Sequence, residues 1–216
     1  MTRALKSDIP GVDWRISPED LSERGLDAIW GDGFPKPLRP VVDVGFGRGE
    51  FSLALAEKAP ETPFLAVEYS AKRVHKMARR LARTELRNLR LVHGRAELVI
   101  GEHLPDACIR QFWVNFPDPW PKKRHHRRRV IQPPFVRELV RSLVAGGVLN
   151  VATDHEAYAT HVHQVLSAEP GLENLYAPDA FRAEAPDRTP TAYEMEWRAL
   201  GRPFHFFCYG KAPVDR

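Results

Sequence analysis

The sequence predicts an α/β fold: a doubly wound, mostly parallel sheet of seven strands in a single domain. From Val41 onward, short apolar stretches alternate with helical stretches of about 10 to 16 residues, the pattern of right-handed strand-helix-strand crossovers. A glycine-rich turn follows the first apolar stretch, and each polar motif described below falls at the end of a predicted strand or close to it. Because ligands of such sheets bind at the carboxyl ends of the strands, the pattern also predicts where the functional site lies.

Seven apolar stretches carry the strand prediction. They cover residues 41–47, 64–69, 89–94, 111–116, 146–154, 172–176 and 204–209. Between them, apolar residues recur at helical spacing, which predicts helices over residues 50–59, 70–85, 95–103, 133–144 and 156–169. Proline marks two boundaries, since Pro60 ends the first of these helices and Pro133 stands at the opening of the fourth.

The first 40 residues differ from the rest, and we predict an N-terminal extension (1–40) ahead of the domain (41–216). The sequence SPED from Ser17 has the features of a helix start: a hydroxyl for the cap, a proline in the first turn and two acids facing the helix dipole. The glycine- and proline-rich stretch 31–40 ends the extension.

The positive charge of the chain is concentrated in one segment. Residues 122–129 hold six lysines and arginines, more than the whole net charge of +4, so the rest of the chain is slightly acidic. This pattern favours a nucleic acid partner, because basic clusters bind phosphates with release of counterions. A solvated face or a localisation patch is the alternative for the run alone, and a membrane is disfavoured because no amphipathic apolar face accompanies it.

The sequence lacks the features of membrane, secreted and zinc-binding proteins. It has no run of about 18 or more apolar residues and no apolar signal core at its start, so we expect a soluble, cytoplasmic protein. Cys108 and Cys208 stand far apart with no CxxC pair or Cys/His cluster, so we predict ordinary thiols and no metal site. The oligomeric state, monomer or homodimer, stays open.

The first strand-to-helix turn is a candidate cofactor site. Its glycines at Gly45, Gly47 and Gly49 allow a tight turn and close approach of a ligand to the backbone. A dinucleotide fingerprint needs a third glycine where this chain has Glu50, so the GxGxG spacing favours S-adenosylmethionine over NAD. Asp43 either orders the loop amides or meets the ammonium of the methionine portion. A purely structural glycine turn is the alternative.

Glu68, at the end of the second predicted strand, is the natural partner of a ribose, because its carboxylate can accept from both hydroxyls. The alternative is that Glu68 only supports the start of the next helix at Ser70. Taken with the glycine turn, Glu68 favours a nucleoside-containing cofactor.

The stretch NFPDPWPKKRHHRRR, residues 115–129, joins an acidic turn to the basic run. Prolines restrict the backbone and remove donors on both sides of Asp118 and Trp120, so these two residues lie outside helices and strands. A fixed carboxylate beside an aromatic ring suits a flat polar ligand such as a base, although Trp120 either stacks on the ligand or packs in the core. The turn and the run together predict a site for a base and its neighbouring phosphates.

These residues resemble the bacterial tRNA (guanine-N7)-methyltransferase family. The motifs that carry the resemblance are DVGFGRGEF (43–51), AVEY (66–69), NFPDPWPKKRHHRRR (115–129), QPPF (132–135), GGVLNVATDHEAYA (146–159) and TAYE (191–194). The family implies a Rossmann-like class I methyltransferase with a reversed last strand, S-adenosylmethionine as cofactor and tRNA as partner. It also implies methyl transfer to N7 of a guanosine at position 46, in the variable loop.

The resemblance further implies roles for single residues. The expected cofactor contacts are Asp43, Gly45, Gly47, Gly49, Glu68, Arg95, Ala96 and Asp118, and the expected substrate contacts are Lys122, Asp154, Thr191, Ala192, Tyr193 and Glu194. Two positions depart from the family. Arg95 replaces an acid, so a contact near the adenine is missing or comes from Glu97, and Ala192 replaces a lysine.

The chemistry requires positioning more than proton transfer, because guanine N7 carries an exposed lone pair. Asp118 is the main candidate for a catalytic residue: its carboxylate can stabilise positive charge on the base and accept from N1–H and N2–H2. Asp154 and Glu194 are secondary candidates for the same edge of the base. Lys122 is expected to hold a phosphate. The remaining cations are expected along the RNA backbone: Lys123, Arg124, Arg127, Arg128 and Arg129.

Two other functions stay open. A methyltransferase for another RNA or for a small molecule fits the same fold, although a small molecule does not call for the basic run. A non-catalytic RNA-binding protein on a methyltransferase scaffold fits the departures at Arg95 and Ala192.

Overall fold

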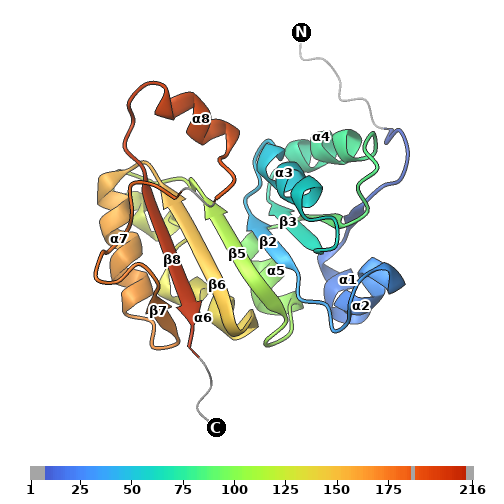
Figure 1. The fold of residues 1–216 in the computed structure, drawn as a ribbon, viewed down its shortest axis with the longest axis horizontal. Coiled ribbons are helices and arrows are strands. Elements are labelled where there is room, and N and C mark those ends of the chain that lie inside the picture. Colours follow the sequence, from blue (N-terminus) through green and yellow to red (C-terminus); the bar gives the residue numbers. More distant parts are fainter. Residues whose placement is uncertain (1–7, 186–187, 213–216) are drawn as a thin grey trace.

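The computed structural model describes residues 8–185 and 188–212, which form one eight-stranded sheet between layers of helices (Figure 1). The strands are β1 (Arg15–Ile16), β2 (Val41–Val44), β3 (Phe64–Glu68), β4 (Leu89–His93), β5 (Ile109–Asn115), β6 (Leu143–Thr153), β7 (Leu172–Asn174) and β8 (His205–Lys211). Their order in the sheet is β1-β4-β3-β2-β5-β6-β8-β7. Strand β8 is antiparallel to both neighbours and every other neighbouring pair is parallel. The predicted α/β fold with a reversed last strand is confirmed.

Helices cover both faces of this sheet. They are α1 (Pro18–Glu23), α2 (Leu26–Trp30), α3 (Glu50–Lys58), α4 (Ala71–Leu81), α5 (Ala96–His103), α6 (Pro133–Ser142), α7 (Glu156–Ser167) and α8 (Ala192–Arg198), with two 3-10 helices, η1 (Gly31–Gly33) and η2 (Lys123–Arg128). Side chains of α3 and α4 form one apolar cluster with the sheet, and those of α5, α6 and α7 form a second, larger one. A third, small cluster contains Ala152, Phe204 and Phe206. No helix in the described ranges is both long and apolar enough to cross a lipid bilayer.

Strand β2 illustrates why the central strands read as apolar runs. Val41 belongs to the cluster with α3 and α4, whereas Val42 and Val44 belong to the cluster with the opposite helices. Successive side chains of a strand point to opposite faces, so a strand covered on both sides needs apolar residues at nearly every position. Asp43 interrupts this run on the face of α3, where its carboxylate accepts from the hydroxyl of Ser52.

The described part of the N-terminal segment packs onto the sheet. Strand β1 pairs with β4 at the edge, and Trp30 of α2 lies in the larger core cluster. Arg90 on β4 donates to the carbonyl of Ile29 at 3.1 Å and lies over the ring of Trp14, 4.4 Å from its centroid. Strand β1 raises the strand number from the predicted seven to eight, because two residues are too short to show a periodic pattern. The domain boundary at residue 40 stays a prediction.

Three helical features differ from the sequence-based expectation. Helix α8 begins within the TAYE motif and continues to Arg198, and the basic run folds into η2, although no helix was predicted at either place. Helix α4 ends at Leu81, earlier than predicted, because the amide and the hydroxyl of Thr84 both donate to the Leu81 carbonyl, at 2.9 and 2.8 Å. These bonds close the last turn and redirect the chain.

Candidate active site

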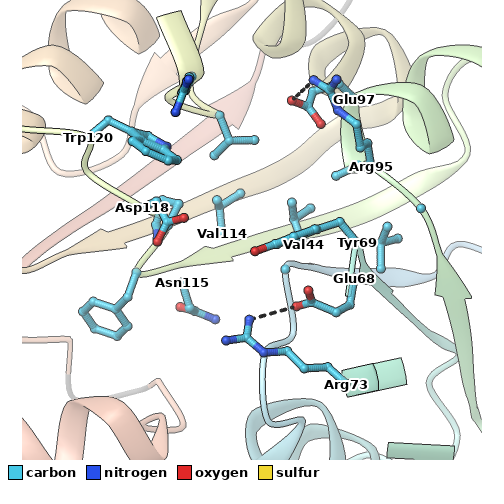
Figure 2. Close-up of a pocket in the computed structure, with 18 residues that line it drawn as sticks. Val44, Glu68, Tyr69, Arg73, Arg95, Glu97, Val114, Asn115, Asp118 and Trp120 are labelled. Atoms are coloured by element: carbon cyan, nitrogen blue, oxygen red, sulfur yellow. Dashed lines mark hydrogen bonds and ion pairs between the residues drawn. The ribbon is translucent and has the colours of Figure 1, made fainter. Parts of the chain in front are cut away.

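Two adjoining cavities open at the carboxyl ends of the central strands, and Figure 2 shows the larger one. Their volumes are about 450 and 270 Å³. Both are lined by Gly45, Arg73, Asn115, Phe116 and Asp118, so they form one continuous site. The larger cavity has an apolar floor that includes Val44 and Val114. This is the edge of the sheet at which the sequence predicts a ligand.

The glycine turn and Glu68 form one hydrogen-bonded unit. Gly45, Gly47 and Gly49 have φ values of 73°, 59° and 82°, a left-handed backbone that favours glycine. Glu68 Oε2 accepts from the Gly47 amide and Oε1 accepts from the Ser70 amide, both at 3.0 Å. Glu68 therefore supports the start of α4 as well as the turn. Since each carboxylate oxygen can accept twice, acceptor capacity remains for a ligand such as a ribose.

Four further side chains border the larger cavity: Tyr69 and Arg73 beside Glu68, and Arg95 and Glu97 from the segment after β4 (Figure 2). Arg73 Nη1 lies 3.7 Å from Glu68 Oε2. Arg95 Nη2 donates to Glu97 Oε1 at 3.2 Å, and Ala96 between them also lines the cavity. An acidic side chain is thus present at this wall, supplied by Glu97 two positions after Arg95.

Asp43 is buried beneath the glycine turn and lines the smaller cavity. Ser52 Oγ donates to its Oδ2 at 2.5 Å. Burial raises the pKa of Asp43 to about 7, although the Ser52 hydrogen bond and the charge of Arg188 act in the opposite direction. Within the described residues no loop amide donates to Asp43: the Gly45 and Phe46 amides donate to the Val67 carbonyl, and the Gly47 amide donates to Glu68. The predicted contact of Asp43 with an ammonium group stays a prediction.

The turn after β5 holds Asp118 at the junction of the two cavities. The residues that flank its proline pair, Phe116 and Trp120, have φ values of 50° and 43°, which non-glycine residues rarely adopt and which concentrate at functional sites. Asp118 is exposed, and its carboxylate has no hydrogen-bond or ion-pair partner in the described part of the chain. Trp120 lines the larger cavity and lies outside the apolar clusters, with Arg128 over its ring at 5.0 Å from the centroid.

The basic run separates into exposed cations and one buried arginine. The exposed members are Lys122, Lys123, Arg124, Arg127 and Arg128. Arg129 is only 4% exposed; its Nε donates to the Pro119 carbonyl at 2.9 Å and its guanidinium lies 5.0 Å from the ring centroid of Tyr158. The expectation that Arg129 follows the RNA backbone does not hold, because its side chain faces the interior and braces the turn that carries Asp118.

Thr191 and Glu194 form the capping box that starts α8. The Glu194 amide donates to Thr191 Oγ1 at 3.0 Å, and the Thr191 amide donates to Glu194 Oε2 at 3.4 Å. Glu194 also pairs with Arg188 and, at 3.1 Å, with Arg198. It is buried and lines neither cavity. Because its carboxylate is committed to these partners, we no longer expect Glu194 to accept from guanine.

Of the other predicted substrate contacts in this region, three line the smaller cavity and the fourth, Asp154, does not. Thr191, Ala192 and Tyr193 line the smaller cavity. The Tyr193 hydroxyl donates to Asp154 Oδ2 at 2.8 Å, and Arg202 pairs with the same oxygen. Asp154 lines neither cavity, so the structure places it behind Tyr193 as its support.

Asn115 lines both cavities of the site, and Arg188 contacts it from a neighbouring cavity of about 310 Å³; neither was predicted as a site residue. Arg188 Nη2 donates to Asn115 Oδ1 at 2.7 Å, and Arg188 also pairs with Glu194. Four aromatic rings surround its guanidinium with centroids 4.9 to 5.9 Å away: Phe51, Trp113, Phe116 and Phe206. The contacts of Arg188 join segments far apart in the sequence, so no local pattern announces them. Asn115 is the first residue of the NFPDPW motif, and this position at the end of a predicted strand is the sequence feature that could have identified it.

Cys108 and Cys208 are both free thiols. Cys108 is buried, and burial raises the pKa of its thiol to about 11, which makes it unreactive near neutral pH. Cys208 is half-buried. In the ranges that the structure describes, no three His, Cys, Asp or Glu side chains are grouped so as to hold a metal ion.

Comparison with known proteins gives matches over most of the chain. The model of the family described as "Putative methyltransferase" matches residues 39–207. A tRNA (guanine-N(7)-)-methyltransferase of Leifsonia xyli subsp. xyli is 41% identical over 188 residues, 87% of this chain and 81% of that protein. A protein of the same name from Halorhodospira halophila is 37% identical over 216 residues, 99% of this chain and 91% of that protein.

Solved structures with the same fold are more distant in sequence. The 16S rRNA methyltransferase KamB superimposes with a TM-score of 0.64 at 16% identity, covering 89% of this chain and 94% of that one. The aminoglycoside resistance methyltransferase NpmB1 superimposes with a TM-score of 0.57 at 18% identity, covering 82% of this chain and 89% of that one. At these identities the likeness concerns the fold alone.

Proposed function

This chain belongs to the tRNA (guanine-N(7)-)-methyltransferase family, and we propose that it transfers the methyl group of S-adenosylmethionine to N7 of guanosine 46 in the variable loop of tRNA. The observation that carries the proposal is the position of Asp118. Its carboxylate, which has no partner among the described residues, lies where the two cavities join, just after β5 and ahead of the exposed cations of η2. A cofactor that spans the two cavities and a base in the smaller one would both reach it.

The residues of the larger cavity fit the nucleoside part of S-adenosylmethionine. Glu68 offers acceptors to the ribose hydroxyls, and the valines of the floor offer an apolar surface to the adenine. Glu97 and Arg95 would border the exocyclic edge of that ring. When bound, the cofactor supplies a methyl group activated by a positively charged sulfur.

The residues of the smaller cavity fit the methionine part and the target base. Asp43 lies beside the glycine turn and, once ionised, suits the cofactor ammonium. On the other side, Tyr193 and Phe116 offer aromatic surfaces, with ring centroids 5.0 Å apart. A purine packed between these rings and Asp118 would face the glycine turn.

Asp118 acts in this reaction by charge and by position. The lone pair of N7 needs no base to release it, so no proton has to leave before the new bond forms. Asp118 accepts from N1–H and N2–H2 of guanine, which directs the opposite edge of the base toward the methyl group. Its negative charge also stabilises the positive charge that the imidazole ring of the base acquires. Oriented donors or charges of this kind contribute about 100-fold or more to such rates.

The exposed cations of η2 are proposed to hold the tRNA backbone. Lys122 follows the turn of Asp118 directly, and the next four exposed cations continue along η2. Lys72, Lys76 and Arg80 on α4 are also exposed and would extend the basic surface. Tight binding of tRNA by these groups would weaken steeply with salt. We place this activity in the cytoplasm, where tRNA is available.

The test uses labelled S-adenosylmethionine and two unmodified tRNA transcripts, one with guanosine and one with adenosine at position 46. We expect label in the first transcript alone, recovered as 7-methylguanosine after hydrolysis. Equal labelling of both transcripts, or recovery of a different methylated nucleoside, would show that the position or the chemistry is wrong. Absence of cofactor binding by calorimetry would point to a non-catalytic RNA-binding protein.

A further inference from the structure

Arg73, on the first turn of α4, lies at the site with its hydrogen-bonding capacity unused. It lines both cavities, and Figure 2 shows its side chain extending from α4 toward Glu68. The side chain is 51% exposed, and its contact with Glu68 is long, since 3.7 Å separate Arg73 Nη1 from Glu68 Oε2. In the described part of the chain its guanidinium makes no hydrogen bond. Its donors are therefore available to a ligand.

The other cations of the site have closer partners within the chain. Among the described residues, the cations that line the two cavities are four arginines: Arg48, Arg73, Arg95 and Arg128. Arg48 and Arg95 each donate to a glutamate two positions later, at 3.1 and 3.2 Å. Arg128 lies over the ring of Trp120, 5.0 Å from its centroid. Arg73 is thus the arginine of the site that is best able to bind an anionic group of a ligand.

The amides of the glycine turn offer few donors to such a group. The Gly45 and Phe46 amides both donate to a carbonyl of β3, at 2.8 and 3.3 Å. The Gly47 amide donates to Glu68, and the Gly49 amide donates to the Phe46 carbonyl at 2.9 Å. Glycine turns at the start of a helix often hold anions through their amides, but four amides of this turn already have acceptors within the chain. The first amides of α3 are the backbone donors that could compete with Arg73.

S-Adenosylmethionine brings one anionic group to the site. Its methionine part carries an ammonium and a carboxylate on the same carbon atom, so the two groups bind close together. The acids that line the smaller cavity, Asp43 and Asp118 among them, attract the ammonium and repel the carboxylate. A carboxylate that leaves water without a partner is costly. A guanidinium matches its two oxygens with paired N–H donors, and Arg73 stands at the wall of this cavity.

We propose that Arg73 binds the carboxylate of S-adenosylmethionine and so makes the site select a cofactor that carries this group. The inference rests on the proposed function, which places the methionine part in the smaller cavity. Arg73 then lies between two carboxylates, that of the cofactor and that of Glu68, which is proposed to hold the ribose. A phosphate of the tRNA is the competing anion, and the experiment separates the two.

The experiment measures the binding of S-adenosylmethionine and of its decarboxylated form by calorimetry, without tRNA. The two ligands share the adenosine, the sulfonium and the amine, and they differ in the carboxylate alone. For the unmodified protein we expect S-adenosylmethionine to bind at least about tenfold more tightly, the effect of a hydrogen bond between charged groups. For Arg73→Gln we expect the affinity for S-adenosylmethionine to fall by about tenfold and that for the decarboxylated form not to fall, so the preference disappears.

A matched control and a second measurement make the outcome specific. Arg83→Gln removes the same charge from an exposed arginine that lies just beyond α4 and lines neither cavity, so the preference should persist in this variant. Filter binding of tRNA to Arg73→Gln should show little change, because Arg73 contacts the cofactor and not a phosphate. Retained binding of the decarboxylated form shows in the same titration that Arg73→Gln is folded.

Several results would overturn the inference. If the unmodified protein binds both ligands equally, or if Arg73→Gln keeps the preference, Arg73 does not hold the carboxylate and the first amides of α3 are the remaining donors. If Arg73→Gln weakens both ligands equally, Arg73 acts only through Glu68 and the ribose. If the preference persists while the affinity for tRNA falls, the anion that Arg73 binds is a phosphate.

A failure of the proposed function gives a different result. An unmodified protein that binds no S-adenosylmethionine would refute the cofactor and this inference together. Normal binding and the expected loss of preference, with the methyl label recovered in a nucleoside other than 7-methylguanosine, would refute the proposed target and leave the role of Arg73 standing.

Discussion

The hydroxyl of Tyr193 on α8 donates to Oδ2 of Asp154, the residue that follows β6, over a distance of 2.8 Å. This bond ties the short helix that borders the smaller cavity to the end of a central strand. Arg202 pairs with the same Asp154 oxygen and lies 3.9 Å from the ring centroid of Trp197, so the tie is reinforced from two sides. The position of the Tyr193 ring at the site is thus set by the sheet.

Replacing Tyr193 by phenylalanine tests this tie, because the ring is kept and only the hydroxyl is removed. We expect kcat/KM for tRNA to fall by about fivefold, the effect of one missing hydrogen bond, with little change in the affinity for S-adenosylmethionine. Steady-state kinetics and calorimetry give the two quantities. Met195→Ala, an exposed change on the same helix, should leave both as they are. An unchanged kcat/KM in Tyr193→Phe would mean that the tie is dispensable.

Replacing Asp118 separates catalysis from binding. We expect Asp118→Ala and Asp118→Asn to lower the rate of methyl transfer by about 100-fold or more, because both remove the charge that faces the base. Affinity for tRNA, measured by filter binding, should change little, since the exposed cations supply most of it. Asp179→Ala, an exposed aspartate outside the site, is the control. Near-normal turnover in Asp118→Asn would show that the charge of this residue is not needed.

Binding of the cofactor should depend on pH through Asp43. The pKa of this buried carboxyl is about 7, above its value of about 4 in an unfolded chain, so the folded protein without ligand holds a proton on Asp43 between these two values. This protonation stabilises the fold fully below about pH 4, and the contribution is lost as the pH rises through about 7. A cofactor ammonium favours the ionised form, so its binding releases a proton below pH 7.

We therefore expect the affinity for S-adenosylmethionine to rise between pH 5.5 and about 7, by up to about tenfold per unit. Calorimetry in two buffers with different ionisation enthalpies measures the proton released. Asp43→Asn should bind more weakly at pH 7.5 and show no such release, whereas Glu57→Gln, an exposed change on α3, should behave as the unmodified protein. A pH-independent affinity in the unmodified protein would place the ammonium away from Asp43.

Substitution of the exposed cations of the basic run should affect tRNA binding, whereas substitution of the buried Arg129 should affect stability. Lys123→Ala combined with Arg124→Ala should weaken tRNA binding and lower the slope of log affinity against log salt by about 1 for each phosphate that is no longer neutralised, without changing the melting temperature. Arg129→Ala should lower the melting temperature, because a buried guanidinium that bonds to Pro119 is removed. If instead Arg129→Ala changed only the salt dependence, its side chain would have to face the RNA.

The residues predicted from the sequence are those whose neighbours are local. Glu68 and the glycine turn are recognisable because a strand end, a spacing and a residue type coincide within one strand-helix unit, and Asp118 is recognisable because three prolines surround it. Their functional roles nevertheless stay predictions. The structure adds how Glu68 holds the turn and where Asp118 lies relative to both cavities.

The residue roles that the sequence does not reveal depend on contacts between segments that are far apart in the chain. Arg188 gains its importance from Asn115, 73 positions earlier in the chain, and from rings contributed by two strands, a turn and a helix. Arg129 looks identical to its neighbours in the sequence, and only the packing of Tyr158 against it shows that it is buried. Residue type and spacing report neither burial nor partners across the fold, so these assignments need the three-dimensional structure.

The hydrogen bond from the Gly47 amide to Glu68 makes the shape of the glycine turn depend on the same carboxylate that we propose for the ribose. A change of cofactor preference in this fold would therefore be difficult by single steps. Substituting Glu68 to accommodate a phosphate on the ribose would also release the turn, and reshaping the turn alone would leave a carboxylate that repels that phosphate. The two ends of this bond have to change together, which restricts the evolutionary routes from this site to a different nucleotide.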